Sequence, residues 1–423
     1  MSNESNQDLV VGLDAGGTRT RAVLASAATG RTLGEAAAGP GNALTVPLPQ
    51  LTGHLAEAIG RAVPERDRGR VVAVVGGFAG AASGPPAAGS SAAGSAGSAD
   101  PSELSGPSDL LGFSDRDPGR LNALAALAEA LRRLGVAPRT VGVSSDIEAA
   151  FASAPGTPAD GLALVAGTGA AATRISDRRC TVSVDGDGWL LGDEGSGFWI
   201  GRGAVRAALR MADGRGDPTT LARSVGLALG LPADLLEGAE GVEGASEAHG
   251  IYESHESHET DGVDEVDGTD GGGAVEGAGG TGALRRQGTG RGAAGAAHWS
   301  RARREAFRTR LLPTVMAQPP VALARLAPLV AEAARRKDPV ATAILREAVD
   351  HLAAAVRALD PRPGERIVVT GGLLGPDGPL AAPLTGRLER LGLTVDRVTD
   401  GCRGAVALAR LGHGSPSQAT GTS

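Results

Sequence analysis

Lysine is almost absent from this chain of 423 residues, in which Lys337 is the only lysine among 41 basic residues. A P-loop requires a lysine in the pattern GxxxxGK[ST] to reach the phosphates of a nucleotide. The residues around Lys337, ARRKDPV, do not form that pattern. The near absence of lysine therefore excludes a Walker-type nucleotide site and leaves other ways of binding phosphate open.

Cysteine and long apolar runs are also scarce. Cys180 and Cys402 lie far apart and outside any CxxC spacing, which excludes a disulfide framework and a cysteine metal site and favours a reducing compartment. No apolar run approaches the roughly 18 residues of a membrane span. The first residues, MSNESNQDLV, have neither the basic nor the apolar part of a signal peptide. These absences predict a cytoplasmic protein with no membrane partner.

Acidic charge is concentrated in one segment. The formal net charge is −7, but residues 234–276 alone hold 14 acidic residues and no arginine or lysine. Because the acidity is local, it says little about the folded part of the chain. The charge balance gives no reason to expect nucleic acid as a partner.

Two stretches lack apolar periodicity. The first is rich in Ala, Gly, Ser and Pro, and the second is rich in Gly and acidic residues. Such compositions cannot bury enough apolar surface to offset the entropy lost on ordering. We expect flexible, disordered insertions at residues 81–118 and 238–297, and a disordered tail at residues 413–423. His255 and His258 are interpreted as part of the polar tract rather than as metal ligands.

Between the insertions, short apolar runs alternate with stretches of helical spacing, a pattern typical of an α/β fold. Ser196 is placed to cap a helix that begins in FWIGRGAVRAALR. The predicted strands are residues 9–13, 21–25, 71–75, 140–143, 161–165 and 367–370, and the predicted helices are residues 51–62, 121–134, 340–356 and 403–411.

A glycine-rich turn joins two apolar runs in VVGLDAGGTRTRAVLAS, residues 10–26, and another does so in LALVAGTGAAATRI, residues 162–175. Each alone is an ordinary hairpin signal. Glycine turns also present backbone N–H groups to an anion, and threonine adds a hydroxyl donor. Two such units indicate turns that hold a polyphosphate from both sides of a cleft. GLDAGG leads into a strand rather than a helix, which excludes a Rossmann dinucleotide site.

Three further stretches are candidates for chemistry. VGVSSDIEAAF places Asp146 at the carboxyl end of an apolar strand, a common position for catalytic groups, although Asp146 is equally interpretable as a helix cap. IVVTGGLLG ends a strand at Gly371 and Gly372, which would admit a flat ring or form a tight turn. DGDGWLLGDEGSGFWIGRGAV is dense in glycine and aspartate and carries two of the three tryptophans.

The motifs of this chain, taken in order, resemble those of the N-acetylglucosamine kinases of the BadF/BadG/BcrA/BcrD ATPase group. These motifs are GxDxGGTxT, S-D-x-x-A-A, A-G-T-G, G-D-E-G-S with an aromatic pair, and T-G-G. The resemblance covers most of residues 8–235 and 300–412. It implies an α/β fold of two actin-like (ribonuclease H-like) domains flanking an ATP cleft. We expect the N-terminal domain at residues 1–143, the C-terminal domain at residues 144–400, and a terminal helix at residues 401–412 that packs back on the N-terminal domain.

The resemblance also implies cofactors and residue roles. ATP and Mg²⁺ are the implied cofactors; Asp14 would orient the metal, and Asp146 would be the general base that takes a proton from the sugar hydroxyl. The remaining positions divide by ligand: Gly16, Gly17, Thr18, Thr168 and Gly169 would hold the phosphates, Gly371 and Gly372 would pack near the adenosine, and Asn42, Gly186 and Asp193 would face the sugar with Asp146. Asn42, in GPGNAL, is equally interpretable as a turn residue.

The chain departs from the family pattern at the sugar pocket. Ala170 and Ala171 follow the second turn where the family has Ser-Asn, and Asp187 stands between Gly186 and Gly188 where the family has tryptophan. These changes affect the sugar side and leave the phosphate-binding residues intact. The identity of the sugar therefore stays open.

The expected activity is ATP-dependent phosphorylation of an amino sugar, with N-acetylglucosamine to N-acetylglucosamine 6-phosphate as first choice and glucosamine or N-acetylmuramic acid as alternatives. The expected partner is the small-molecule amino sugar, and a homodimer is the candidate assembly. An ATPase activator of a radical dehydratase would need closely placed cysteines, which Cys180 and Cys402 do not provide. A non-catalytic sugar sensor would carry an N-terminal helix-turn-helix, whereas only about eight residues precede the first strand.

Overall fold

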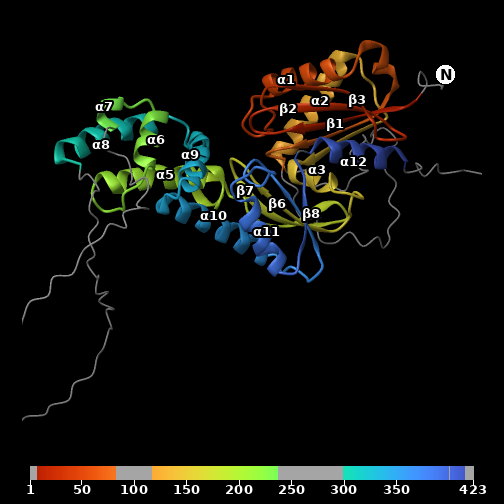
Figure 1. Cartoon of the computed structure of the whole chain (residues 1–423). Helices are drawn as coiled ribbons and strands as arrows, with labels where there is room; N and C mark the ends of the chain where they lie inside the picture. Colours follow the sequence, from red (N-terminus) through yellow and green to blue (C-terminus); the bar gives the residue numbers. More distant parts are fainter. Residues whose placement is uncertain (1–6, 82–116, 237–298, 400, 415–423) are drawn as a thin grey trace, which may run out of the picture.

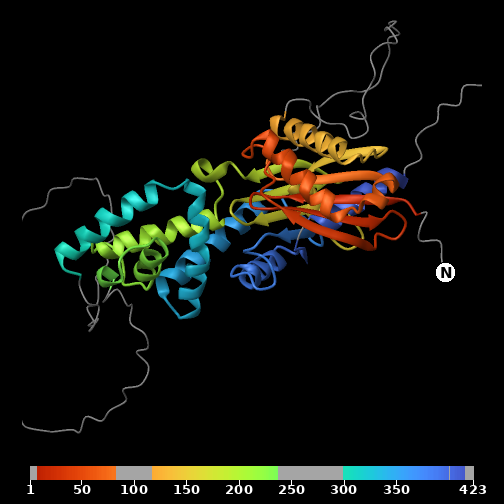
Figure 2. The same ribbon diagram turned by 90° about the horizontal axis from the view of Figure 1, so that it is seen from above.

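The computed structural model describes residues 7–81, 117–236, 299–399 and 401–414. Two five-stranded sheets lie one above the other, and a lobe of helices projects from the second sheet (Figures 1 and 2). The expected insertions fall almost wholly outside the described residues, as do His255, His258 and most of the tail expected at residues 413–423. The first two residues of that tail, 413 and 414, instead end a helix that begins at Cys402. The two-sheet α/β architecture is the one that the sequence predicts.

The first sheet has the strand order β3-β2-β1-β4-β5. Strands β1, β2 and β3 are antiparallel neighbours, whereas β4 and β5 run parallel to β1. The central strands β1 and β4 are apolar on both faces and almost fully buried, which explains why they read as continuous apolar runs. The strands are β1 (Leu9–Ala15), β2 (Thr20–Ser26), β3 (Thr32–Ala38), β4 (Val71–Phe78) and β5 (Thr140–Ser145).

The second sheet has the same arrangement of strands as the first sheet. Its order is β8-β7-β6-β9-β10, with β6, β7 and β8 antiparallel and with β9 and β10 parallel to β6. Thus β6 takes the place of β1 and β9 that of β4, so the two glycine turns hold equivalent positions in duplicated sheets. The strands are β6 (Gly161–Ala166), β7 (Ala170–Ser176), β8 (Arg179–Asp185), β9 (Arg366–Thr370) and β10 (Thr394–Arg397).

Helices α1 (Leu48–Ala62) and α2 (Pro118–Leu134) cover the outer face of the first sheet (Figure 1). Asp117 caps α2 by accepting the N–H of Gly119, and Pro118 is its first residue. Ala81 is buried in the core beneath these helices. The ends of the expected insertion at residues 81–118 are therefore ordered. A short 3₁₀ helix, η2 (Glu65–Arg70), leads into β4.

Two helices fill the space between the sheets, α3 (Asp146–Ala152) and α12 (Cys402–Gly414) (Figure 1). On α3, Phe151 packs against the second sheet, while α12 packs on the first sheet through Val406. The two helices cross closely at Gly404, whose N–H donates to Ser153 Oγ over 2.8 Å. The first sheet continues through β5 to Ser145, two residues beyond the expected domain boundary at 143.

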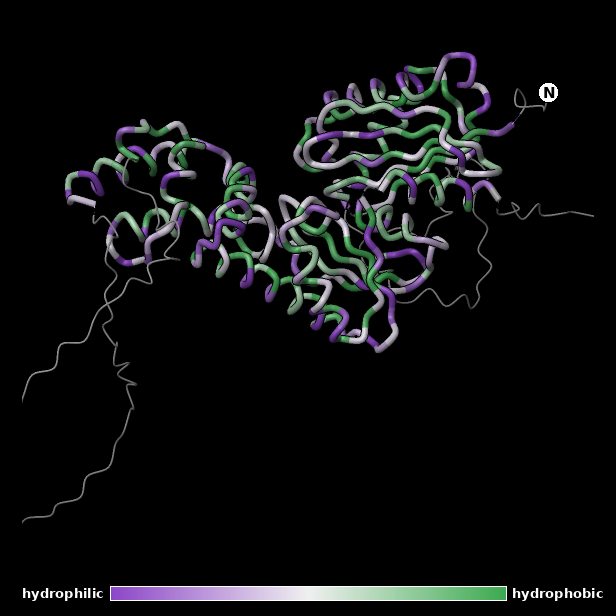
Figure 3. Tube along the Cα trace, in the orientation of Figure 1, coloured by the Kyte–Doolittle hydropathy of each residue, from purple (hydrophilic) through white to green (hydrophobic). Residues whose placement is uncertain are grey.

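The remaining helices form the lobe and the outer cover of the second sheet. Helix α10 runs from the lobe to the sheet and joins the two parts into one apolar core (Figure 1). Colouring by hydropathy shows the apolar strands running through the middle of both sheets (Figure 3). No helix in the described ranges is both long and apolar enough to cross a membrane. The helices are α4 (Gly188–Leu191), α5 (Gly197–Ala212), α6 (Leu221–Ala228), α7 (Ala233–Leu236), α8 (Arg301–Met316), η4 (Pro320–Leu326), α9 (Ala327–Arg335), α10 (Pro339–Arg357) and α11 (Ala381–Arg390).

Candidate functional site

The carboxyl edge of the parallel strands in the first sheet brings two aspartates together. Asp14 on β1 pairs in register with Gly77 on β4, and Gly77 pairs with Ser144 on β5. Asp146 follows two residues after Ser144, at the start of α3. Because parallel strands end at the same edge, residues far apart in sequence meet there, and this edge is where α/β proteins commonly bind ligands.

Asp14 faces the space between the sheets. Val10, Gly12 and Asp14 alternate onto one face of β1, and Val10 packs against α12 on that face. A Cβ atom on Gly12 would lie 2.6 Å from the backbone nitrogen of Val406, so only glycine lets α12 approach this closely. Asp14 Oδ2 accepts the N–H of Gly401 over 3.1 Å, which fixes the carboxylate at the beginning of α12.

Asp146 is the first residue of α3 but not its cap. Ser145 caps the helix: its Oγ accepts the N–H of Glu148, and Glu148 accepts the N–H of Ser145 in return. The interpretation of Asp146 as the cap is therefore wrong, although Asp146 Oδ1 does accept the adjacent N–H of Ile147 over 2.9 Å. Burial raises the pKa of Asp146 to about 6, and the negative charges of Asp14 and Glu148 add to the rise.

Glu148 links this aspartate to the second sheet, a connection that sequence reasoning missed. Its side chain is buried; Oε2 accepts the N–H of Ser145 over 3.0 Å, and Oε1 accepts the N–H of Cys180 on β8 over 2.9 Å. The positive charges of Arg120 on α2 and Arg179 on β8 also act on this carboxylate. The S-x-x-E spacing of residues 145–148 is a capping-box signal that would have found Glu148.

The first glycine turn, Gly16, Gly17 and Thr18, lies next to Asp14 and is largely exposed. The N–H of Gly16 donates to the carbonyl of Arg19 over 3.0 Å and closes the turn. Neither glycine has a positive φ, and a Cβ on Gly17 would meet no atom within 4 Å. The protein itself therefore does not require glycine at 17, and the open space leaves room for a ligand to approach the backbone.

The second glycine turn is built on helix α5. The N–H of Gly167 donates to Gly169, while Gly197 and Phe198, the first residues of α5, donate to Gly167 and Thr168 over 2.7 and 3.2 Å. Ser196 caps α5 by accepting the N–H of Trp199, which confirms the cap expected from sequence. The side chain of Thr168 stays exposed. This turn is thus held rigidly from the lobe side.

Asp193 lies directly against the second turn. Its Oδ1 accepts the N–H of Ala170 over 3.0 Å, and a Cβ on Gly169 would come within 2.7 Å of the same oxygen. Burial raises the pKa of Asp193, and the charges of Asp185 and Asp187 raise it further against the effect of the Ala170 N–H. Asp193 is therefore brought to the second glycine turn as well as to the loop expected to face the sugar.

Asp185 organises that loop and was not foreseen from sequence. Its carboxylate accepts the N–H groups of Gly186, Asp193 and Glu194 over 2.6 to 2.8 Å. Gly186 has φ +84° and is exposed, so the turn itself favours glycine there. The structure thus places Gly186 and Asp193 in one hydrogen-bonded loop beside Ala171, 3.1 Å from a Cβ on Gly186.

Asn42 lies in the N-terminal half of the chain, and its side chain stabilises the turn that follows it. Its Oδ1 accepts the N–H groups of Leu44 and Thr45 over 2.9 and 3.0 Å. The neighbouring Gly41 donates to Gly16 over 2.8 Å, which ties this loop to the first glycine turn. The turn interpretation of Asn42 is therefore confirmed, and the same contacts place the residue near the candidate site.

The two glycines after β9 have different reasons for being glycine. Gly371 has φ +105°, and a Cβ there would collide with the carbonyl of Ala166. A Cβ on Gly372 would meet no atom within 4 Å. Gly371 is thus required by the fold, whereas the surroundings of Gly372 are open.

The donor set at the edge of the first sheet suits magnesium. Within the described residues, no group of three or more His, Cys, Asp or Glu side chains could hold a metal by itself. Mg²⁺ usually binds one or two carboxylates together with substrate phosphates and waters. Asp14, a carboxylate beside the first glycine turn, is of the type that this mode of binding uses.

Comparison with known proteins shows the fold and the family of this chain. Two solved structures share the fold, both of proposed N-acetylglucosamine kinases: one from Chromobacterium violaceum, at 20% identity and TM-score 0.54 over 96% of this chain and 99% of that one, and one from Porphyromonas gingivalis, at 16% identity and TM-score 0.53 over 96% and 99%. No curated protein matches the chain. The model of the BadF/BadG/BcrA/BcrD ATPase family matches residues 126–382, more than half of the sequence. The chain therefore belongs to the BadF/BadG/BcrA/BcrD ATPase family.

Proposed function

We propose that this protein is an ATP-dependent kinase of an amino sugar, with N-acetylglucosamine as the first-choice substrate and its 6-phosphate as product. The observation that carries the proposal is the pair of glycine turns on duplicated sheets, with Asp14 and Asp146 at the carboxyl edge of the first. The names of the two similar structures support the choice of sugar.

The two turns divide the work of holding the phosphates. Gly16, Gly17 and Thr18 offer backbone and hydroxyl donors from the first sheet, and Thr168 and Gly169 offer them from the second. Bound Mg²⁺ would neutralise charge that develops on the phosphates. Asp14 supplies the carboxylate for it, and the N–H of Gly401 keeps that carboxylate in place.

Asp146 is the proposed general base. Its carboxylate takes the proton of the sugar hydroxyl as that oxygen bonds to the γ-phosphorus, while the bond from the γ-phosphorus to the bridging oxygen breaks and ADP leaves. A base with a pKa near 6 is ionised at neutral pH and still accepts a proton readily. Phosphoryl transfer depends mainly on positioning, which the contacts of Glu148 supply.

The remaining residues are assigned by their surroundings. Gly372 is proposed to lie against the adenosine, since nothing in the chain occupies the space beside it, and Gly371 shapes that turn. Asn42, Gly186 and Asp193 are proposed to face the sugar. Ala170, Ala171 and Asp187 set which amino sugar fits.

The test is release of ADP from Mg²⁺-ATP in the presence of N-acetylglucosamine, glucosamine, N-acetylmuramic acid, N-acetylgalactosamine, N-acetylmannosamine or glucose. We expect release that depends on one amino sugar and that falls roughly 10²- to 10⁴-fold in Asp146→Asn. The matched control is Asp177→Asn, which removes a carboxylate that is 95% exposed. ADP release that ignores every sugar, or that survives Asp146→Asn, would instead identify an ATPase switch on the same fold.

A further inference from the structure

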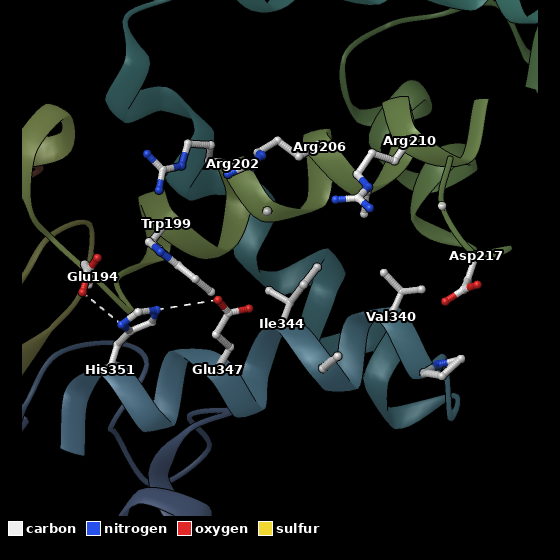
Figure 4. A pocket seen from close by; sticks show the side chains of 15 residues that line it. Glu194, Trp199, Arg202, Arg206, Arg210, Asp217, Val340, Ile344, Glu347 and His351 are labelled. Atoms are coloured by element: carbon white, nitrogen blue, oxygen red, sulfur yellow. Dashed lines mark ion pairs between the residues drawn. The ribbon is translucent and has the colours of Figure 1, made fainter. Parts of the chain in front are cut away.

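A groove of about 640 Å³ lies between helices α5 and α10 (Figure 4). Its volume is within the usual range of small-molecule sites. None of the residues assigned to the kinase site lines it, although Glu194, at one end, directly follows Asp193. The groove is therefore a separate concavity on the lobe that adjoins the second glycine turn.

One wall of the groove carries a ladder of arginines. Arg202, Arg206 and Arg210 recur every four residues along α5 and line the groove with Trp199 before them. At about 1.5 Å of rise per residue, neighbouring members lie roughly 6 Å apart along one face of the helix. Figure 4 shows them along the α5 side, opposite Ile344 and Val340 of α10.

The ladder lacks the ion pairs that other arginines of the lobe have. Arg215 pairs with Asp213, and Arg336 pairs with Glu332. Across the described ranges, by contrast, no carboxylate lies within ion-pairing distance of Arg202, Arg206 or Arg210. Arg202 rests on the ring of Phe198, 5.4 Å from its centroid. Three like charges gathered in a concavity repel one another, and a bound anion would relieve this repulsion.

Three carboxylates also line the groove. Asp217 stands at the Arg210 end, outside ion-pairing distance of the ladder, while Glu194 and Glu347 at the other end are engaged (Figure 4). His351 lies between Glu194 and Glu347, with Nδ1 2.9 Å from Glu194 and Nε2 3.8 Å from Glu347. The indole of Trp199 packs edge-on against the imidazole of His351, with ring centroids 5.1 Å apart. An aromatic face flanked by carboxylates and an imidazole suits a ring rich in hydroxyl groups, because it offers both an apolar surface and hydrogen-bond partners.

Because one end of the groove carries the arginine ladder and the other carries Trp199 and His351, we propose that the α5–α10 groove is a second ligand site. It binds a phosphate monoester carried on a sugar ring. The phosphate lies on Arg206 and Arg210, where guanidinium groups form charge-assisted hydrogen bonds, and the sugar lies against Trp199 beside Glu194. The ligand class follows from the side chains of the groove; only the choice of N-acetylglucosamine 6-phosphate as first probe rests on the proposed function.

The test is calorimetric titration of the full chain, without ATP and at low salt, with four probes: N-acetylglucosamine 6-phosphate, N-acetylglucosamine, inorganic phosphate and ADP. The titration is repeated in Asn42→Ala, which removes a proposed sugar contact of the kinase site in the first half of the chain, so that binding which survives this change is assigned to the groove. We expect the sugar phosphate to bind, and Arg206→Gln to weaken that binding by roughly 10-fold or more. The control Arg310→Gln makes the same change of charge on the exposed face of α8 and should leave the affinity unchanged.

Each other result overturns the proposal in a defined way. If the variant that carries both Arg206→Gln and Arg210→Gln binds the sugar phosphate as tightly as the wild type does, the arginine ladder is not the phosphate site. If inorganic phosphate binds as tightly as N-acetylglucosamine 6-phosphate, the groove does not recognise the sugar ring. If ADP binds most tightly of the four probes, the groove is a nucleotide site instead. Because binding is measured without turnover, a chain with no kinase activity can still pass this test, and an active kinase can still fail it.

Discussion

The backbone N–H of Gly401 donates to Asp14 Oδ2 over 3.1 Å and joins the first strand to the start of helix α12 across 387 positions of sequence. A Cβ on Gly401 would lie 3.4 Å from that carboxylate, so the approach is tight. The carboxylate proposed to orient the metal is thus held by a residue outside its own half of the sequence. The position of α12 and the geometry of the proposed phosphate site should change together.

The pKa of Asp146 predicts a pH profile. A general base works only when it is deprotonated, and burial together with Asp14 places this pKa at about 6. We expect kcat/KM to fall about tenfold per pH unit below 6 and to level off above it. Initial rates between pH 5 and 8 measure this. A flat profile across that range would remove Asp146 as the base.

The same shift predicts that Asp146→Asn stabilises the protein at high pH. The folded-state pKa lies above the ordinary value of 3.8, so the folded state holds the proton more tightly. Stability therefore falls as pH rises from about 4 to about 6 and stays lower above that range. Removing the charge should raise the free energy of unfolding by on the order of 3 kcal/mol at pH 8, because the pKa is raised from 3.8 to about 6, but not at pH 4. Urea denaturation at both pH values measures this, and equal stability at pH 8 would contradict it.

Gly371 and Gly372 form a matched pair for testing the proposed adenosine site. Gly371→Ala should destabilise the fold by about 1–3 kcal/mol, because φ is +105° and the Ala166 carbonyl blocks the new methyl group. Gly372→Ala meets no neighbour, so its unfolding free energy should stay near the wild-type value while KM for ATP rises. Thermal unfolding and ATP titration separate the two effects. An unchanged KM in Gly372→Ala would remove this residue from the adenosine site.

Glu148→Gln should affect both folding and catalysis. The neutral amide keeps the shape of the side chain but weakens the bonds from Ser145 and Cys180, at a cost of about 1.5–3 kcal/mol in stability. It should also lower kcat with little change in KM, because Asp146 loses its support. The control is Glu129→Gln, whose pairs with Arg132 and Arg133 lie at the surface and contribute little. Equal effects of the two substitutions would contradict the positioning role.

Gly404→Ala should separate the two helices between the sheets. A Cβ there would collide with the carbonyl of Ala149 and lie 2.6 Å from the nitrogen of Ser153, so α12 must move away from α3. We expect a loss of about 1–3 kcal/mol. The control Gly53→Ala, on α1, meets no atom within 4 Å and should stabilise the fold by about 0.5–1 kcal/mol. Denaturant melts compare the two, and similar midpoints would show that the crossing tolerates the methyl group.

The central strands were predictable because each is a continuous apolar run, a pattern that is visible in its own sequence. Strands β1 and β4 are continuous apolar runs, and the repeated glycine turn foretold the duplicated hairpins. Edge strands β3 and β10 were not predicted, since TLGEAAA and the four-residue TVDR are largely exposed and owe their conformation to a neighbouring strand. Helix α8 carries an internal proline, Pro313, which sequence rules take as a helix end.

The candidate site was predictable by position but not by geometry. The motif order located Asp14 and Asp146, but that Ser145, rather than Asp146, caps α3 depends on the turn after β5. The pKa of Asp146 depends on burial and on Asp14, which only the assembled sheet provides. Asp185 could not be recognised either, because its three backbone donors come from a loop that folds back on it.

Helix α12 gives the chain an order of assembly. The inner face of the first sheet, with Val10 and Val75, is covered by a helix that begins at Cys402. At about 5–20 residues per second, synthesis of the chain between β4 and α12 takes on the order of twenty seconds to a minute. During that time an apolar sheet face on the nascent chain lacks its cover. The N-terminal half should therefore be a substrate for chaperones during translation, and its folding should be completed only when α12 leaves the ribosome.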